Sequence, residues 1–127
     1  MPRLSPSADR PANSAETVAK AALRAAEHLD VAQSTLARII GLSEASVSRL
    51  SQGHYKLDLA GKPFELALLF IRLFRSLDAI VGGDEATARA WLRGDNLALG
   101  GRPLDLITRV SGLIDVIAYL DSRRALV

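Results

Sequence analysis

The sequence predicts an all-α fold, and three features of its 127 residues support this prediction. Hydrophobic residues make up 49% of the chain but aromatic residues only 5%, so Leu, Ala, Val and Ile must build the core. The apolar residues recur at the three- and four-residue spacing of a helix, and no segment alternates like a strand. The five prolines stand near the ends of these patterned segments, where helices begin and end.

The first half of the chain contains three predicted helices. Residues 1–13 include three prolines and little apolar surface, so we expect them to form a flexible arm. The first helix is expected to begin at Ser14, and its apolar face carries Val18, Ala21, Ala22, Ala25 and Leu29. The second runs from about Gln33 to Ile40 and ends at Gly41. The third has Ser43 as its N-cap and ends at Gly53.

The second half contains four predicted helices. The longest runs from Pro63 to about Val81, because proline suits a first helical turn and an apolar stripe follows it. Gly82 and Gly83 end this helix, and Asp84 caps the next one, from Glu85 to Leu92. Pro103 begins a helix that carries Leu104, Ile107 and Val110, and the last helix carries Leu113, Val116, Ile117 and Leu120.

Composition excludes several classes of protein. The chain has no cysteine, which removes disulfides and thiolate chemistry. Its longest apolar run is cut by Arg72 and is far shorter than the ~20 residues of a membrane span. The polar N-terminal residues predict no signal peptide, so we expect a cytoplasmic protein without a membrane partner. The mean hydropathy of +0.16 is high for a small domain and favours a protein partner.

The stretch from Gln33 to Gly53 carries the most specific pattern in the chain. A helix-turn-helix unit needs a small residue in its first helix, a glycine at the turn and branched apolar residues in its second helix. With Gln33 as position one, these requirements are met by Ala37, Gly41, Val47 and Leu50. The unit resembles the helix-turn-helix of phage repressors and Xre-like proteins. The alternative is an ordinary pair of short helices joined by a glycine turn.

The outward residues of the second helix favour DNA binding over that alternative, since most are small and polar and one is arginine. We predict that the DNA-binding residues are Gln33, Ser34, Ser43, Glu44, Ser46, Ser48, Arg49 and Gln52. Arg49 would read a guanine edge, and Gln33, Ser34 and Ser46 would hold phosphates. Glu44 fits only if it accepts from a cytosine amino group. Because the net charge is only +2, we expect a homodimer on two half-sites of operator DNA.

A second motif spans Ala90 to Arg124. It combines a Trp-Leu pair at residues 91–92, Asn96, a Leu-Gly-Gly run at residues 99–101, and a Pro-Leu pair at residues 103–104, followed by Leu106, Gly112, Val116 and Leu120. This pattern resembles the C-terminal toxin-binding domain of the MbcA/ParS/Xre antitoxin family. With the Xre-like helix-turn-helix before it, the resemblance covers roughly residues 15–124.

The resemblance implies an antitoxin that represses its own operon and neutralises a partner toxin. Toxins of this kind are commonly of the RES type, which consumes NAD, or related ADP-ribosyltransferases. The antitoxin then blocks the active-site cleft of the toxin with its C-terminal domain. We predict that the toxin-binding residues are Arg102, Arg109, Leu113, Arg123 and Arg124, since guanidinium groups suit a cleft that binds phosphates. Trp91 is expected to anchor the core beneath the turn at Gly100 and Gly101.

Nothing in the sequence predicts an enzyme. His28 and His54 stand in different segments without the spacing of metal ligands. Gly100 and Gly101 neither follow a strand nor precede the Lys-Ser/Thr pair of a phosphate-binding loop. No serine has the context of an activated nucleophile. We therefore expect no catalytic residue, metal or cofactor.

The predicted organisation has three parts: an arm over residues 1–13, an Xre-like helix-turn-helix domain over 14–83 and a toxin-binding domain over 84–127. Two other functions remain open at this point. The chain could be a stand-alone repressor whose last helices serve only dimerisation. It could also be a toxin-inhibiting protein that has lost DNA binding, which the acidic Glu44 and the mild charge favour.

Overall fold

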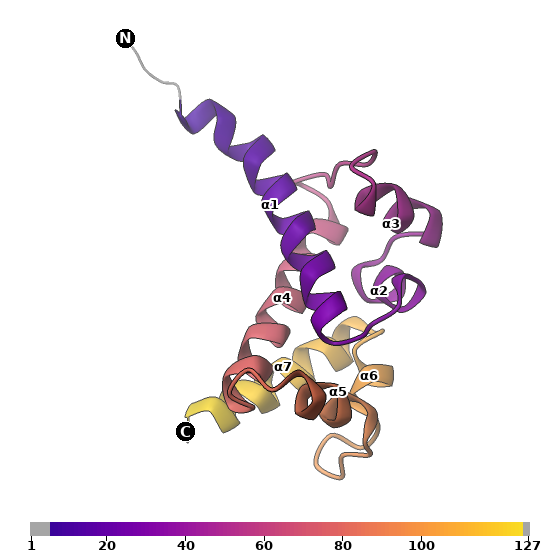
Figure 1. Ribbon diagram of the computed structural model, residues 1–127, viewed down its shortest axis with the longest axis vertical. Helices are drawn as coiled ribbons and strands as arrows, with labels where there is room; N and C mark the ends of the chain where they lie inside the picture. Colours follow the sequence, from indigo (N-terminus) through magenta and orange to yellow (C-terminus); the bar gives the residue numbers. More distant parts are fainter. Residues whose placement is uncertain (1–5, 126–127) are drawn as a thin grey trace.

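A computed structural model describes the backbone of residues 6–125, and over that range the chain forms helices and no strand (Figure 1). The prediction of an all-α fold is therefore confirmed. The only bridge of strand type among the described residues joins Asn96 to Gly101. The helices are α1 (Pro6–His28), α2 (Gln33–Ile40), α3 (Glu44–Ser51), α4 (Lys62–Ile80), α5 (Glu85–Arg93), α6 (Pro103–Leu106) and α7 (Val110–Ala125).

Local signals place most helix ends where the sequence predicts them. Gly41 ends α2 with a φ of 75°, a left-handed conformation that glycine adopts without a steric penalty. Ser43 caps α3, because its Oγ accepts a hydrogen bond from the Ser46 N–H at 3.1 Å. Asp84 caps α5 in the same way, with its Oδ1 3.3 Å from the Thr87 N–H.

Two predicted boundaries differ from the structure. Helix α1 begins at Pro6 rather than Ser14, since a proline in the first turn gives up no helical hydrogen bond. Residues 1–5 of the predicted arm lie outside the described residues. The helix predicted from Pro103 through Val110 ends instead at Leu106, and Val110 opens α7. The chain turns between them because the Leu106 carbonyl group packs against Gly112, where any side chain would collide with it.

Helix α4 is the centre of the molecule. It packs against α1 and α2 near its start and most extensively against α7 (Figure 1). The buried side chains of both halves form one continuous core, and the largest of them are Phe70, Leu29, Leu36, Ile40, Leu73, Leu77, Leu92, Ile107, Leu113 and Leu120. The domain border predicted at residue 83 therefore comes just after α4, the helix against which both halves of the chain pack.

Two arginines of α5 hold the second half of the chain to the end of α1. Arg89 donates to the carbonyl oxygens of residues 27 and 28, the shorter bond being 2.9 Å from its Nε. Arg93 donates to the carbonyl oxygens of residues 29 and 30, the shorter bond being 2.7 Å from its Nη2. A helix C-terminus leaves its last carbonyls unpaired and carries partial negative charge, so guanidinium groups are well suited to this position. We name these two residues and their four acceptors the arginine clamp.

Candidate nucleic-acid and protein interfaces

Helices α2 and α3 have the packing that a helix-turn-helix unit requires. The small residue of α2, Ala37, is 2% exposed, which lets the two helices approach closely. Val47 and Leu50 of α3 are also buried and fix the rotation of α3 about its axis. The left-handed Gly41 makes the turn between the helices. All four constrained positions of the predicted motif are therefore confirmed.

This rotation leaves one face of α3 open to solvent. The face consists of Glu44, Ala45, Ser48, Arg49 and Gln52, and Ser48 is only partly exposed. These positions recur at three and four residues, as residues on one helical face do. Sequence reasoning missed Ala45, which lies between Glu44 and Arg49 on the face. Its small side chain allows a second molecule to approach the helix backbone.

A chain of hydroxyl groups holds Arg49 along this face. The Ser43 Oγ donates to the Ser46 Oγ at 3.0 Å, and Arg49 Nη2 donates to the same oxygen at 3.4 Å. The Ser43 and Ser46 hydroxyls therefore have partners within the chain already. The contact with Ser46 places the Arg49 guanidinium beside the first turn of α3.

The remaining predicted DNA-binding residues lie on α2. Gln33 is exposed at the first position of the helix, and Ser34 is partly buried beside it. The N-cap residue of α2 is Ala32, which offers no side chain to the first-turn N–H groups. Arg38 is exposed on the same helix and was not predicted. The field of Arg38 reaches Asp105, whose pKa is lowered mainly by its hydrogen bond with Arg102 and further by Arg38.

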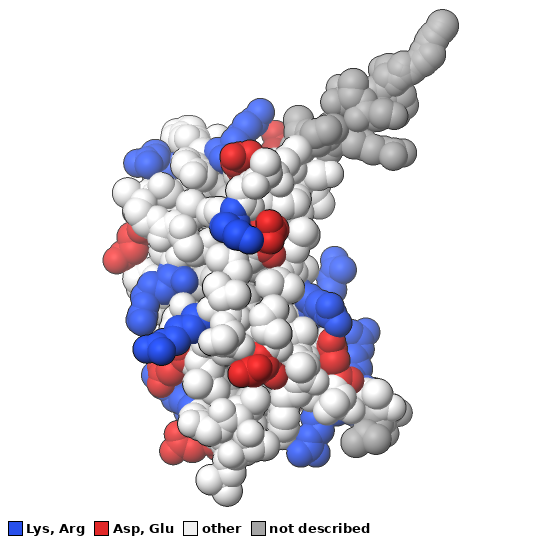
Figure 2. Space-filling model, turned by 180° about the vertical axis from the view of Figure 1, so that it is seen from behind, with Lys and Arg blue, Asp and Glu red and all other residues white. Residues whose placement is uncertain are grey.

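Charge on the face of the molecule behind the view of Figure 1 is mixed in sign. Figure 2 shows acidic and basic side chains interspersed there, without a large field of either sign. Such a surface does not attract a polyanion strongly over distance. The candidate nucleic-acid interface is instead the open face of α3, because it is the second helix of the helix-turn-helix unit and carries small polar side chains beside Arg49.

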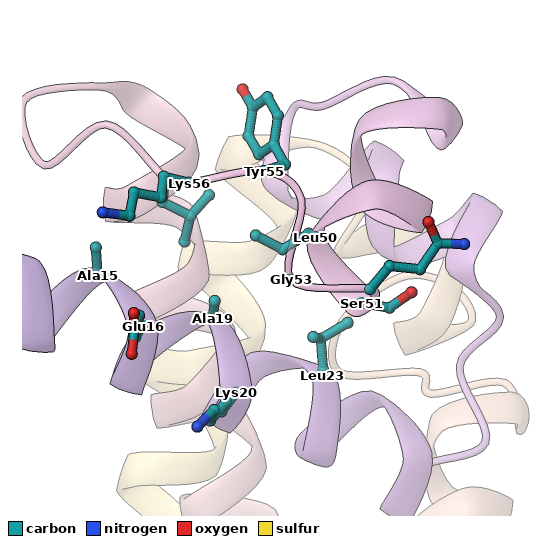
Figure 3. A pocket seen from close by; sticks show the side chains of 12 residues that line it. Ala15, Glu16, Ala19, Lys20, Leu23, Leu50, Ser51, Gly53, Tyr55 and Lys56 are labelled. Carbon is teal, nitrogen blue, oxygen red and sulfur yellow. The ribbon is translucent and has the colours of Figure 1, made fainter.

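A cavity of about 430 Å³ lies beside the end of α3 and is shown in Figure 3. Its apolar walls come from α1 and from the end of α3, and its charged residues are Glu16, Lys20 and Lys56. It contains neither of the two histidines: His28 contacts Glu85 of α5, and His54 is exposed after α3. The described residues also contain no group of three side chains placed to hold a metal ion. The cavity therefore offers no converging set of catalytic groups.

The structure separates the predicted toxin-binding arginines instead of gathering them. Arg109 lies just before α7, whereas Arg123 and Arg124 lie in its last turn, about 20 Å away at 1.5 Å per residue. Arg102 is paired with Asp105 by two hydrogen bonds of 3.0 and 2.8 Å. The four arginines cannot all enter one narrow cleft.

Leu113 does not belong to any surface. Its side chain is fully buried in the core between α7 and its neighbours, so its prediction as a toxin contact is wrong. The exposed apolar residues of α7 are Val110, at 58%, and Ile114, at 46%. Val110 lies three residues before the buried Leu113, and Ile114 lies directly after it. The periodicity of Leu113 with Val116, Ile117 and Leu120, which are also buried, is that of the core face of α7.

Trp91 is also placed differently from its prediction. Its ring is only partly buried and stacks on Tyr119 with 6.1 Å between ring centroids. Of the adjacent residues Trp91 and Leu92, it is Leu92 that is fully buried. The turn at Gly101 packs over Leu106 instead of the tryptophan. Trp91 therefore packs against the core but is only partly buried, and it is not enclosed beneath the glycine turn.

These observations define a two-part helical protein with a helix-turn-helix unit and a second unit joined to it through α4. Comparison with family models assigns each part. The antitoxin Xre-like helix-turn-helix domain matches residues 11–72, and the antitoxin Xre/MbcA/ParS C-terminal toxin-binding domain matches residues 76–125. The chain belongs to the Xre/MbcA/ParS antitoxin family, and it is an antitoxin with a helix-turn-helix domain.

A search of curated proteins finds no match to the chain. The two family matches meet within α4, several residues before the border predicted at residue 83. Among the described residues, no helix is both long enough and apolar enough to cross a membrane.

Proposed function

We propose that this antitoxin neutralises a toxin of the RES type by blocking its active site. The observation that supports this most is the match of residues 76–125 to a toxin-binding domain. The exposed guanidinium groups of Arg109 and Arg123 add chemical support, since a cleft that binds NAD offers sites for phosphate groups and for their neutralising partners. The antitoxin acts by binding and performs no reaction of its own.

We further propose that it represses its own operon as a homodimer. The open face of α3 carries small polar side chains around an oriented arginine, which suits insertion into the major groove. Since the net charge is only +2, one copy neutralises few phosphates and binds weakly. Two copies on two half-sites double the number of contacts, which makes a homodimer the expected DNA-binding form.

Co-expression tests neutralisation. The reading frame adjacent to this gene is placed under an inducible promoter, with and without the antitoxin, and growth is followed after induction. We expect growth arrest without the antitoxin and normal growth with it. Growth arrest that the antitoxin does not relieve would contradict the proposal.

DNA binding is tested by fluorescence anisotropy with the upstream region of the same operon at low salt. Each good bidentate contact of an arginine with guanine is worth about 1–3 kcal/mol, so Arg49→Ala should weaken binding by about 5- to 150-fold. Arg75→Ala, an exposed substitution on α4 outside the α3 face, should leave it unchanged. No binding by the unmodified protein would favour an antitoxin that only inhibits its toxin.

Growth rescue and DNA binding together distinguish the antitoxin from a stand-alone repressor. A stand-alone repressor would bind the upstream DNA but would not relieve growth arrest by the adjacent gene product. The same pair of assays thus distinguishes all three functions.

A further inference from the structure

A small apolar cleft opens on the surface of the toxin-binding domain, where the end of α4 meets α5 and α7. Its volume is about 270 Å³. Leu77 and Leu120 form its floor and are almost fully buried. Ile80 and Trp91 stand on its rim and are only partly buried. We name it the tryptophan cleft.

Three side chains form a stack along one edge of the tryptophan cleft. The rings of Trp91 and Tyr119 are inclined by 23° with their centroids 6.1 Å apart. The guanidinium carbon of Arg123 lies 5.0 Å from the centroid of the Tyr119 ring, within the range of a cation–π contact. Arg123 forms no ion pair with any described residue, so its charge is available to a partner.

The size and polarity of the cleft identify the kind of occupant. Small-molecule sites usually have volumes of about 300–1,000 Å³ and several convergent polar groups. The tryptophan cleft is smaller, and its one charged group is Arg123. Trp, Tyr and Arg are also the residues in which the binding energy of protein interfaces is concentrated. These properties fit an apolar side chain of another protein, flanked by a carboxylate that pairs with Arg123.

All residues of the cleft lie within residues 76–125, which match the toxin-binding domain. We propose that the tryptophan cleft receives a large apolar side chain of the toxin and that Arg123 pairs with an acidic residue beside it. This inference rests on the proposed function, because it locates the contact through which the antitoxin holds its toxin. It also assigns different roles to two neighbouring arginines. Arg124 does not line the cleft; its Nη1 donates to the Ser76 Oγ, and these two atoms are 3.4 Å apart.

Fluorine NMR can observe the tryptophan cleft directly, because Trp91 is the only tryptophan of the chain. The antitoxin is labelled with 5-fluorotryptophan and titrated with the unlabelled protein encoded by the adjacent reading frame. We expect its one resonance to shift on binding. Arg123→Ala should weaken binding about tenfold or more, as at interface positions rich in binding energy. The control variant Arg75→Ala, at an exposed arginine of α4 outside the cleft, should change affinity less than twofold, and melting curves of both variants should confirm that they fold.

Each other result overturns the inference in a distinct way. If the unmodified antitoxin does not bind the adjacent gene product, the proposed function fails and the inference fails with it. If binding is tight but the resonance is unmoved and Arg123→Ala binds normally, the toxin docks elsewhere and only the inference fails. A resonance that shifts with antitoxin concentration alone would show that a second copy occupies the cleft.

Discussion

The arginine clamp makes a testable claim about how the two halves of the antitoxin are held together. Arg93 donates to the carbonyl oxygens of residues 29 and 30, at 3.1 and 2.7 Å, and to that of Arg89 at 3.0 Å. The first two bonds join α5 to the last residues of α1 and the turn after it. Arg93→Met keeps much of the apolar stem but removes all three bonds. We expect this substitution to destabilise the whole protein.

The size of the effect follows from the two bonds that join the halves. Hydrogen bonds that involve a charged group contribute about 1.5–3 kcal/mol each. The bond to residue 30 is solvent-exposed, so water replaces part of it and its loss costs less. Together these give a loss of about 2–3 kcal/mol in the free energy of unfolding, or roughly 6–15 °C in Tm for a protein of this length.

Urea denaturation followed by circular dichroism measures this loss. Arg75→Met serves as the control, because Arg75 is exposed and forms no ion pair or hydrogen bond among the described residues, so its loss should cost less than about 0.5 kcal/mol. A single transition is expected, since both halves share one core. If Arg93→Met is as stable as the control, or if the unmodified protein unfolds in two steps, the clamp does not couple the halves.

Three further predictions concern local features. Ser43→Ala removes the cap of α3 and should lower the unfolding free energy by about 1 kcal/mol, whereas Ser43→Gly should lower it by only a few tenths, both in urea titrations. Gly112→Ala should lower the unfolding free energy by about 1–3 kcal/mol, because the added carbon would lie 2.7 Å from the Leu106 carbonyl carbon. At an ordinary helical glycine the same change raises the unfolding free energy by about 1 kcal/mol. A rise at Gly112 would contradict this packing. The pKa of Asp121 is lowered by its hydrogen bond from Ser76 and by a nearby arginine of α4. A carboxyl group whose pKa is lowered on folding stabilises the protein above its unfolded pKa of about 3.9, and this stability is lost as the pH falls through the folded pKa. The difference in unfolding free energy between Asp121→Asn and the unmodified protein should therefore disappear in acid. A difference that does not depend on pH would refute this prediction.

The helices and the helix-turn-helix unit could be predicted because their causes are local. Gly41 ends a helix through its own backbone conformation, and Ser43 caps one through an oxygen three residues from its partner. Ala37 and Val47 are constrained by the close packing of two adjacent helices. Each of these signals lies within a few residues of the structure that it determines, so the sequence alone was sufficient.

The candidate site was predicted less well, because it depends on which face of each helix the rest of the chain covers. Leu113, predicted to contact the toxin, is buried in the core, and Trp91, predicted to anchor the core, packs against it but stays partly exposed. The arginine clamp joins residues about sixty positions apart, and no local pattern marks Arg89 or Arg93 as its members. Arg93 directly precedes Gly94 and Arg89 stands five positions before it, and neither position signals a distant carbonyl partner.

Release of nicotinamide from NAD tests the central claim most directly. The purified product of the adjacent reading frame is supplied with NAD, and nicotinamide is measured as the antitoxin is added in increasing amounts. The proposed function predicts that release falls in proportion to the antitoxin and stops near a stoichiometric ratio. Undiminished release in the presence of a large excess of folded antitoxin would contradict it.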